Sequence, residues 1–86
     1  MKTYLISYDL DKPGQNYQAL IGRLTALGAF RVLMSQWALK SDRTSVQVRD
    51  DLKMCIDAND RLLVTLVTDW ASYNIISSDK FKQVAA

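Results

Sequence analysis

Leu62-Leu63-Val64-Thr65-Leu66-Val67 is the stretch of this chain that decides the fold. Its residues are leucine, valine and threonine, a composition typical of a β-strand. Successive side chains of a strand point to opposite faces of a sheet, so this run places apolar groups on both faces. Strands of this kind are usually buried on both sides. The run therefore predicts a strand in a sheet whose two faces are both covered.

The N-terminal part predicts a strand followed by a helix. Thr3 to Tyr8 is rich in β-branched and aromatic residues and reads as a strand. The pattern breaks after Asp9, where Pro13-Gly14 marks a turn and Asn16 is a candidate helix N-cap. Gly28 is expected to end the helix, since glycine tolerates the left-handed conformation. The apolar positions between them have helical spacing: Tyr17, Leu20, Ile21, Leu24 and Leu27.

The middle of the chain predicts two further strands and a second helix. Ala29 to Ser35 and Gln36 to Lys40 are strand-like and nearly contiguous, so we expect a bulge or tight hairpin near residues 34–36. Thr44-Ser45-Val46-Gln47 fits a capping box that starts a helix. The apolar face of that helix is formed by Val48, Leu52, Cys55 and Ile56.

The element order is strand, helix, strand, strand, helix, strand. Right-handed crossovers on such a chain give an α+β ferredoxin-like β-α-β-β-α-β sandwich, a four-stranded antiparallel sheet with two helices on one face. We assign residues 1–70 to this domain and residues 71–86 to a C-terminal tail, with a short strand around Asn74 to Ser77 and a frayed end.

Two helices cover only one face of the sheet, so the apolar last strand needs a second cover. We expect a homodimer, because symmetric dimers are the commonest oligomers. The alternative is that the tail folds back over this face. The tail supplies four apolar residues for that purpose, Trp70, Tyr73, Ile75 and Ile76.

Composition limits the chemistry. Eleven basic and nine acidic residues give a net charge of +2, compatible with nucleic acid without requiring it. The chain has no histidine, the usual general base and commonest zinc ligand, and all its acidic residues are aspartate. The single cysteine, the lack of a secretory pattern and the lack of an apolar run near about 20 residues predict a cytoplasmic protein with no membrane span.

Short motifs resemble those of the CRISPR-associated endoribonuclease family, the small ferredoxin-like dimers that partner the integrase in spacer acquisition. The motifs are Tyr8-Asp9-Leu10, the Gly28–Trp37 stretch with its Arg-Val pair, and Asn59-Asp60-Arg61-Leu62. Leu33-Met34 departs from the polar residue usual there, and the Asp11 to Asn16 loop looks closer to solitary members outside CRISPR loci. The virulence-associated protein D toxins share this fold. The resemblance implies a dimer, an integrase partner and a role in antiviral defence.

Asp9 is the candidate catalytic and metal-binding residue. It ends the first strand on the face opposite Tyr4, Ile6 and Tyr8, and would face a dimer partner. Two Asp9 carboxylates near a two-fold axis repel unless a cation lies between them, and Mg²⁺ suits such a site. The resemblance implies that this aspartate is the metal ligand. The alternative is that Asp9 ends the strand and caps a turn, and Asp11 is either a second ligand or a solvated carboxylate.

Arg31 and Ser35 are the candidate nucleic-acid-binding residues. We expect both on the same side of the second strand, where they would bind phosphate. The alternative for Arg31 is an edge-strand residue that prevents aggregation. Trp37 is expected to pack in the core or an interface, and Cys55 to be an inert core residue. Three cations form either a basic patch or a solvated face: Arg49, Lys53 and Arg61.

These residues predict a metal-dependent endoribonuclease-like protein that acts on phosphodiesters. We expect RNA as its substrate in preference to DNA. The alternatives are a non-catalytic dimeric scaffold in a nucleic-acid complex and a toxin-like ribonuclease. The scaffold is favoured by the low charge and by the isolation of the Asp9 carboxylate.

Overall fold

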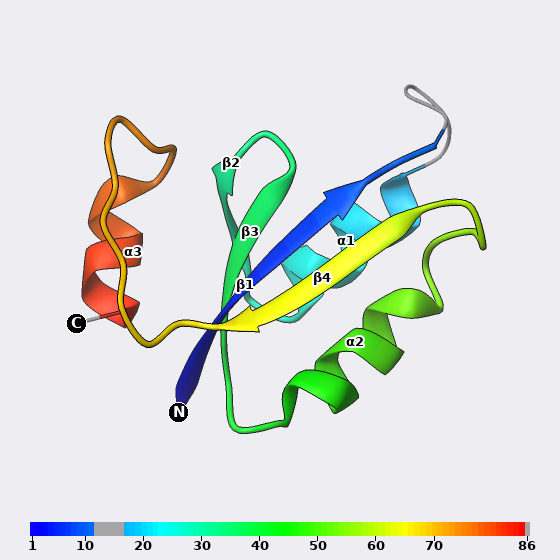
Figure 1. The fold of residues 1–86 in the computed structure, drawn as a ribbon, viewed down its shortest axis with the longest axis horizontal. Helices are drawn as coiled ribbons and strands as arrows, with labels where there is room; N and C mark the ends of the chain where they lie inside the picture. The colour runs from blue at the N-terminus through cyan, green and yellow to red at the C-terminus, as the bar shows by residue number, and fades with distance from the viewer. Residues whose placement is uncertain (12–16, 86) are drawn as a thin grey trace.

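A computed structural model describes residues 1–11 and 17–85 of the chain. Within these residues the chain forms four strands and three helices, and Figure 1 shows how they are arranged. In chain order they are β1 (Lys2–Asp9), α1 (Gln18–Ala26), β2 (Phe30–Leu33), β3 (Gln36–Ser41), α2 (Ser45–Lys53), β4 (Arg61–Leu66) and α3 (Ser78–Val84).

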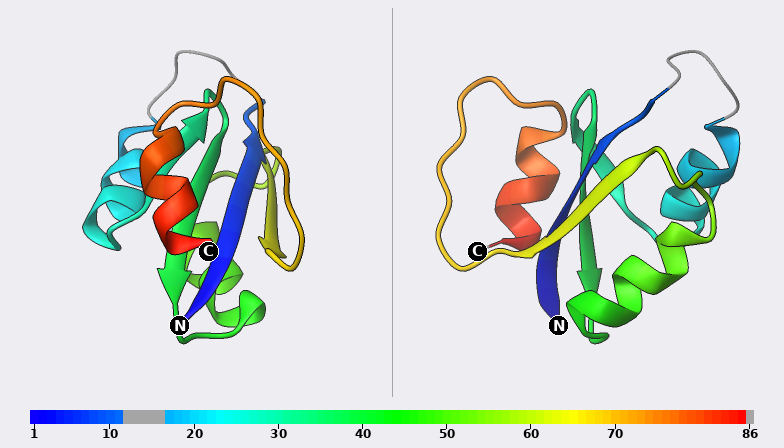
Figure 2. Two further views of the ribbon diagram at one scale, coloured as in Figure 1. Left: turned by 90° about the vertical axis from the view of Figure 1, so that its left-hand side faces the viewer. Right: turned by 45° about the vertical axis from the view of Figure 1, so that its right-hand side comes forward.

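The four strands form one antiparallel sheet in the order β2-β3-β1-β4. This order, with α1 and α2 on one face, is the ferredoxin-like sandwich that the sequence predicts. Figure 2 shows α1 and α2 on one side of the sheet and α3 on the other.

The main core lies between the sheet and the α1–α2 layer. Tyr4 and Ile6 point into it from β1 and are almost fully buried. The Tyr4 hydroxyl donates a hydrogen bond of 2.7 Å to the backbone oxygen of Arg43, which satisfies its polar end. The helices contribute four fully buried residues, Leu20, Leu24, Val48 and Leu52.

Local signals in the sequence set the helix boundaries. The predicted capping box of α2 is confirmed: the Gln47 amide donates to the Thr44 hydroxyl at 3.1 Å, and the Thr44 amide donates to the Gln47 side chain at 2.9 Å. Gly28 follows α1 with φ of 83°, so it takes the left-handed conformation expected of it. The predicted Pro13-Gly14 turn and Asn16 cap lie outside the described residues.

The two middle strands form the tight, irregular hairpin that the sequence predicts. β2 ends at Leu33 and β3 begins at Gln36, so the turn consists of Met34 and Ser35. The β2–β3 register shifts between Arg31 and Leu33. This bulge changes which side chains of β2 share a face.

The tail differs from the expected short strand and frayed end. Asn74 and Ser77 have φ values of 58° and 56°, which an extended strand does not allow. The chain then forms α3, whose Phe81 is 3% exposed and lies against Trp70 with ring centroids 4.6 Å apart. Phe81 also joins Val32 in a second, smaller core. The prediction of a strand at residues 74–77 is therefore wrong, because the left-handed backbone of Asn74 and Ser77 interrupts an extended conformation.

The tail covers only part of the second face. α3 and the segment before it pack over Leu5 and Phe30, as the alternative to a dimer predicts. Of the four tail residues proposed for this role, Trp70 and Ile75 join the second core, whereas Tyr73 is 94% exposed. The β4 side of the sheet stays open, since Leu63 is 63% exposed.

Candidate functional site

Asp9 lies at the end of β1 and is paired with Arg61 of β4. The strand register places the two residues directly opposite each other. Arg61 Nη1 donates to Asp9 Oδ2 at 3.0 Å, and the side chains are 82% and 72% exposed. Ion pairs this exposed are worth about 0–1 kcal/mol, so water, a cation or an anion can readily replace either partner.

Asp9 occupies the face of the sheet that the sequence predicts. Tyr4 and Ile6 lie under the helices, so by strand alternation Asp9 and Ser7 face the other way. A shallow hollow of about 250 Å³ surrounds Asp9. Its lining is Ser7, Tyr8, Asp9, Arg61, Leu62 and Leu63. This hollow lies on the β1–β4 part of the sheet, where Leu63 is exposed.

Asp60, which precedes the Arg61 that pairs with Asp9, does not complete a metal site with Asp9. Asp60 uses both carboxylate oxygens for backbone amides, those of Asp11 at 2.8 Å and Asp57 at 2.9 Å. Across residues 1–11 and 17–85, no group of three or more His, Cys, Asp or Glu side chains is placed to hold a metal ion. Within the described residues, one chain therefore offers the Asp9 carboxylate at this position, and that carboxylate is paired with Arg61.

Arg31 lies on the opposite face from Asp9. It pairs in register with Trp37, which in turn pairs with Ile6 of the main core. The Arg31 guanidinium carbon is 5.0 Å from the centre of the Trp37 ring, a cation–π contact. Its Nε is buried and has no hydrogen-bond partner in the structure. Stacking on Trp37 therefore holds the Arg31 side chain, and its Nε has no hydrogen-bond acceptor in the structure.

Ser35 does not share a strand face with Arg31, which corrects the predicted pair. It lies in the hairpin turn, and its backbone oxygen accepts from the Tyr8 amide at 3.1 Å. The bulge in β2 and the early end of that strand separate the two residues. Trp37 is 7% exposed and donates to the Tyr8 hydroxyl at 3.1 Å, so its predicted packing role is confirmed.

The three cations considered as a basic patch have different surroundings. Arg49 pairs with Asp50 at 2.9 Å and Arg61 pairs with Asp9. Arg49 and Lys53 line a hollow beside α2, which shares Leu62 with the Asp9 hollow. Cys55 is half-buried and packs against the main core, as expected of a core residue.

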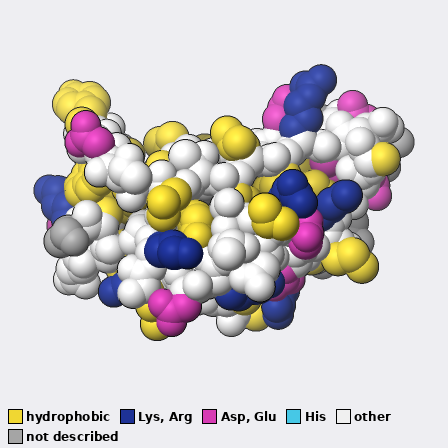
Figure 3. Space-filling model, turned by 60° about the horizontal axis from the view of Figure 1, so that its bottom comes forward, with side chains coloured by type: hydrophobic (Ala, Val, Ile, Leu, Met, Phe, Trp, Pro, Cys, Tyr) yellow, Lys and Arg dark blue, Asp and Glu magenta, His cyan; other side chains and the backbone are white. Residues whose placement is uncertain are grey.

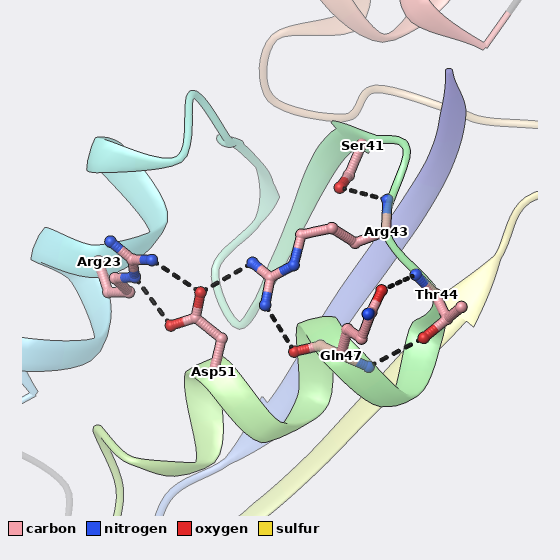
Figure 4. Close-up of polar contacts among 6 residues, drawn as sticks. All are labelled: Arg23, Ser41, Arg43, Thr44, Gln47 and Asp51. Carbon is pink, nitrogen blue, oxygen red and sulfur yellow. Dashed lines mark hydrogen bonds and ion pairs between the residues drawn. The ribbon is translucent and has the colours of Figure 1, made fainter.

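A second charged cluster, which the sequence analysis missed, joins the two core helices (Figure 4). Asp51 of α2 accepts hydrogen bonds from Arg23 of α1 and from Arg43 of the loop before α2. These two guanidinium groups lower the pKa of the Asp51 carboxyl to about 2. Arg43 also donates to the Gln47 backbone oxygen at 2.9 Å, which links the cluster to the start of α2.

No protein-family model matches the chain. No solved structure matches it either. No helix in the described part of the chain is long and apolar enough to span a membrane.

Proposed function

We propose that this protein is a homodimeric, Mg²⁺-dependent endoribonuclease-like protein of the cytoplasm, similar to the small subunit of CRISPR spacer adaptation. An integrase partner follows from the same resemblance. The observation that carries the proposal is the position of Asp9, exposed at the end of β1 on the open part of the second sheet face.

The open face supports a dimer that brings two such sites together. Leu63 is exposed on the same face as Asp9, because it lies opposite Ser7 in the β1–β4 register. A second copy that packs on this area would remove Leu63 from water, which is favourable by about 25 cal/mol per Å² of apolar surface. In a two-fold arrangement the two Asp9 carboxylates would approach each other.

A Mg²⁺ ion fits this position only when two chains contribute. Mg²⁺ is usually bound by one or two carboxylates, several waters and phosphate oxygens. Asp9 of each chain would hold it, since a single chain offers one carboxylate that is already matched by Arg61. When bound, the ion would activate a water molecule and stabilise negative charge on the phosphodiester.

Arg61 and Arg31 would bind the nucleic acid in this proposal. Arg61 is freely accessible and would exchange Asp9 for a phosphate, with which guanidinium groups form paired hydrogen bonds. Arg31, which stacks on Trp37, would contact the backbone from the other face of the sheet. Ser35 in the hairpin turn would donate a further hydrogen bond to phosphate.

A nuclease assay with and without Mg²⁺ tests this function. The parent protein should cleave single-stranded RNA only with the metal, and Asp9→Asn should lower cleavage by at least about 100-fold. Asp69→Asn is the matched control, because Asp69 is also an exposed aspartate, lies outside the lining of the Asp9 hollow and should keep activity. Equal cleavage by the parent and Asp9→Asn would contradict the proposal.

The second candidate is a non-catalytic dimeric scaffold for a nucleic-acid complex. It is supported by the Asp9–Arg61 ion pair, which neutralises the one carboxylate that catalysis would need. Binding of RNA or DNA by both the parent and Asp9→Asn, with no cleavage by either, would favour the scaffold.

A further inference from the structure

The Ser7 hydroxyl lines the Asp9 hollow and has a hydrogen that is free to be donated. Gln36 is directly opposite Ser7 in the β1–β3 register, and its Nε2 donates to Ser7 Oγ at 2.9 Å. A serine hydroxyl can accept from one group and donate its own hydrogen to another. Because an amide nitrogen cannot accept, the Ser7 hydrogen is directed elsewhere. In the part of the chain that the structure describes, no group accepts it.

Arg61 is the nearest charged donor to this hydroxyl by strand pairing. Ser7 is opposite Leu63 in the β1–β4 register, and Arg61 lies two residues before Leu63, so Ser7 and Arg61 are diagonal neighbours on one face. Residues in this relationship are about 7–8 Å apart. Both side chains line the Asp9 hollow. A ligand between them could therefore offer one oxygen to each donor.

The two donors favour a phosphate group as that ligand. The Arg61 guanidinium is 82% exposed and matches the spacing of phosphate oxygens. Serine hydroxyls are common neutral donors to the phosphates of nucleic acids. The oxygens of a phosphate point in different directions around one atom, so a single group can meet donors that come from two strands.

Asp9 sets the condition under which such a phosphate binds. Its carboxylate pairs with Arg61 at 3.0 Å. A phosphate alone would take Arg61 away from Asp9 and place two negative groups side by side, which repel each other. A divalent cation at Asp9 removes this repulsion. The phosphate and the cation should therefore bind together, each about 5–150-fold more tightly in the presence of the other.

Specific contacts matter for affinity because the charge of the chain is mixed. The net charge is only +2. On the side that Figure 3 turns toward the reader, Lys and Arg side chains lie among Asp side chains. A mixed surface of this kind attracts a polyanion only weakly over long distances. The position of individual donors, such as Ser7, should then decide how tightly a nucleic acid is held.

We propose that Ser7 and Arg61 form a subsite for a phosphodiester of single-stranded nucleic acid beside the cation at Asp9, and that Gln36 positions the Ser7 hydroxyl. This subsite deepens the proposed function and rests on it for the cation. Ser7 Oγ donates to one phosphate oxygen, and Arg61 donates to another. The sequence motifs do not include Ser7, whose role follows from its contact with Gln36 and from the pairing of β1 with β4.

RNA binding by hydroxyl variants tests the subsite. Anisotropy of a short labelled single-stranded RNA with Mg²⁺ is read before cleavage proceeds. Ser7→Ala should weaken binding about tenfold, because a hydrogen bond to a charged group is lost, whereas Ser7→Thr keeps the hydroxyl and should bind within about twofold of the parent. Thr65→Ala is the matched control. It removes an exposed hydroxyl from the same face, outside the lining of the hollow, and should bind like the parent.

A neutral backbone distinguishes a phosphate contact from a change in folding. With methylphosphonate linkages in place of phosphates, the advantage of the parent over Ser7→Ala should shrink to less than about threefold, since the acceptor is no longer charged. Gln36→Met should weaken binding of the phosphate RNA about threefold, and should cause no further loss in Ser7→Ala if Gln36 acts through Ser7. Omission of Mg²⁺ should weaken binding at least about fivefold.

The outcomes for the subsite and for the nuclease can be distinguished. Equal RNA binding by the parent and Ser7→Ala, or an equal loss in Ser7→Ala and Ser7→Thr, would overturn the subsite even if Asp9→Asn abolished cleavage. An equal loss for Ser7→Ala on both backbones would also overturn it. Displacement of the RNA by inorganic phosphate at micromolar concentration would make free phosphate the ligand instead. Binding that depends on Ser7 and Mg²⁺ without cleavage by the parent would support the subsite and contradict the nuclease.

Discussion

The Asp51 carboxylate of α2 accepts two hydrogen bonds from the Arg23 guanidinium of α1, from Nε to Oδ1 at 2.8 Å and from Nη2 to Oδ2 at 2.7 Å. Asp51 therefore joins α2 to α1. Arg43 adds a third bond at 2.9 Å. Asp51 is 15% exposed, whereas its two partners are 43% and 40% exposed. The carboxylate is thus the best shielded member of the cluster, and its loss should leave Arg23 without this partner and Arg43 with its hydrogen bond to the Gln47 backbone oxygen.

The first prediction is that Asp51→Asn lowers the free energy of unfolding by about 1–3 kcal/mol, because charge-assisted hydrogen bonds are lost. Urea unfolding at pH 7 measures this. The matched control is Asp50→Asn, whose carboxylate is 57% exposed and should change stability by less than about 1 kcal/mol.

This contribution should depend on pH in a defined direction. The Asp51 pKa is lowered from 3.8 to about 2 in the folded protein, chiefly by its hydrogen bonds to Arg23 and Arg43. The folded state therefore gains stability above pH 3.8 and loses it as the pH falls toward 2. The difference between the parent and Asp51→Asn should shrink over that range. A difference that stays constant down to pH 2 would contradict the assignment.

The second prediction concerns the capping box of α2. Thr44→Ala should lower stability by about 0.5–2 kcal/mol, because the Gln47 amide loses its acceptor. The urea midpoint should fall with an unchanged slope. Thr68→Ala, at an exposed position outside the helices, is the control and should leave the midpoint in place. An unchanged midpoint for Thr44→Ala would show that the capping box does not contribute to the free energy of unfolding.

The elements that could be predicted from sequence are those set by local patterns. The capping box needs only Thr44 and Gln47, three residues apart, and the Gly28 helix end needs a single residue. The strand periodicity of β1 also placed Asp9 on the correct face. These features depend on neighbours in the chain, which the sequence displays directly.

Features that depend on tertiary contacts could not be predicted in this way. α3 has seven residues, and its position depends on Phe81 packing against Trp70 across the sheet face. The separation of Arg31 and Ser35 follows from a register shift between Arg31 and Leu33, whereas the sequence predicts the irregularity at residues 34–36. Antiparallel pairing of the first and last strands is the signal that would have placed Arg61 opposite Asp9.

The third prediction is that the protein is a dimer at micromolar concentration and that Leu63→Asp yields a folded monomer. Leu63 is 63% exposed, so a charge there should not disturb the fold of one chain but should oppose packing on the open face. Light scattering gives the mass and circular dichroism the fold. Met54→Asp, at an 85% exposed site directly after α2, should remain dimeric. A monomeric parent protein would contradict the dimer.

The last prediction concerns Arg61, the partner of Asp9. Arg61→Gln removes the positive charge that neutralises the carboxylate, so divalent cations should bind more tightly at Asp9. Titration calorimetry with Mg²⁺ or Mn²⁺ measures the affinity. Stability should change by less than about 1 kcal/mol, because the ion pair is largely exposed.

Nucleic-acid binding should change in the opposite direction in the same variant. If Arg61 exchanges Asp9 for phosphate, its removal weakens RNA binding and reduces the salt dependence of that binding. Arg49→Gln is the control, because Arg49 pairs with Asp50 beside α2 and should leave metal affinity at Asp9 unchanged. Tighter metal binding combined with weaker RNA binding would assign Asp9 to the cation and Arg61 to the phosphate. Unchanged values of both would mean that the pair serves only to join β1 and β4, and would leave the scaffold as the better account of this face.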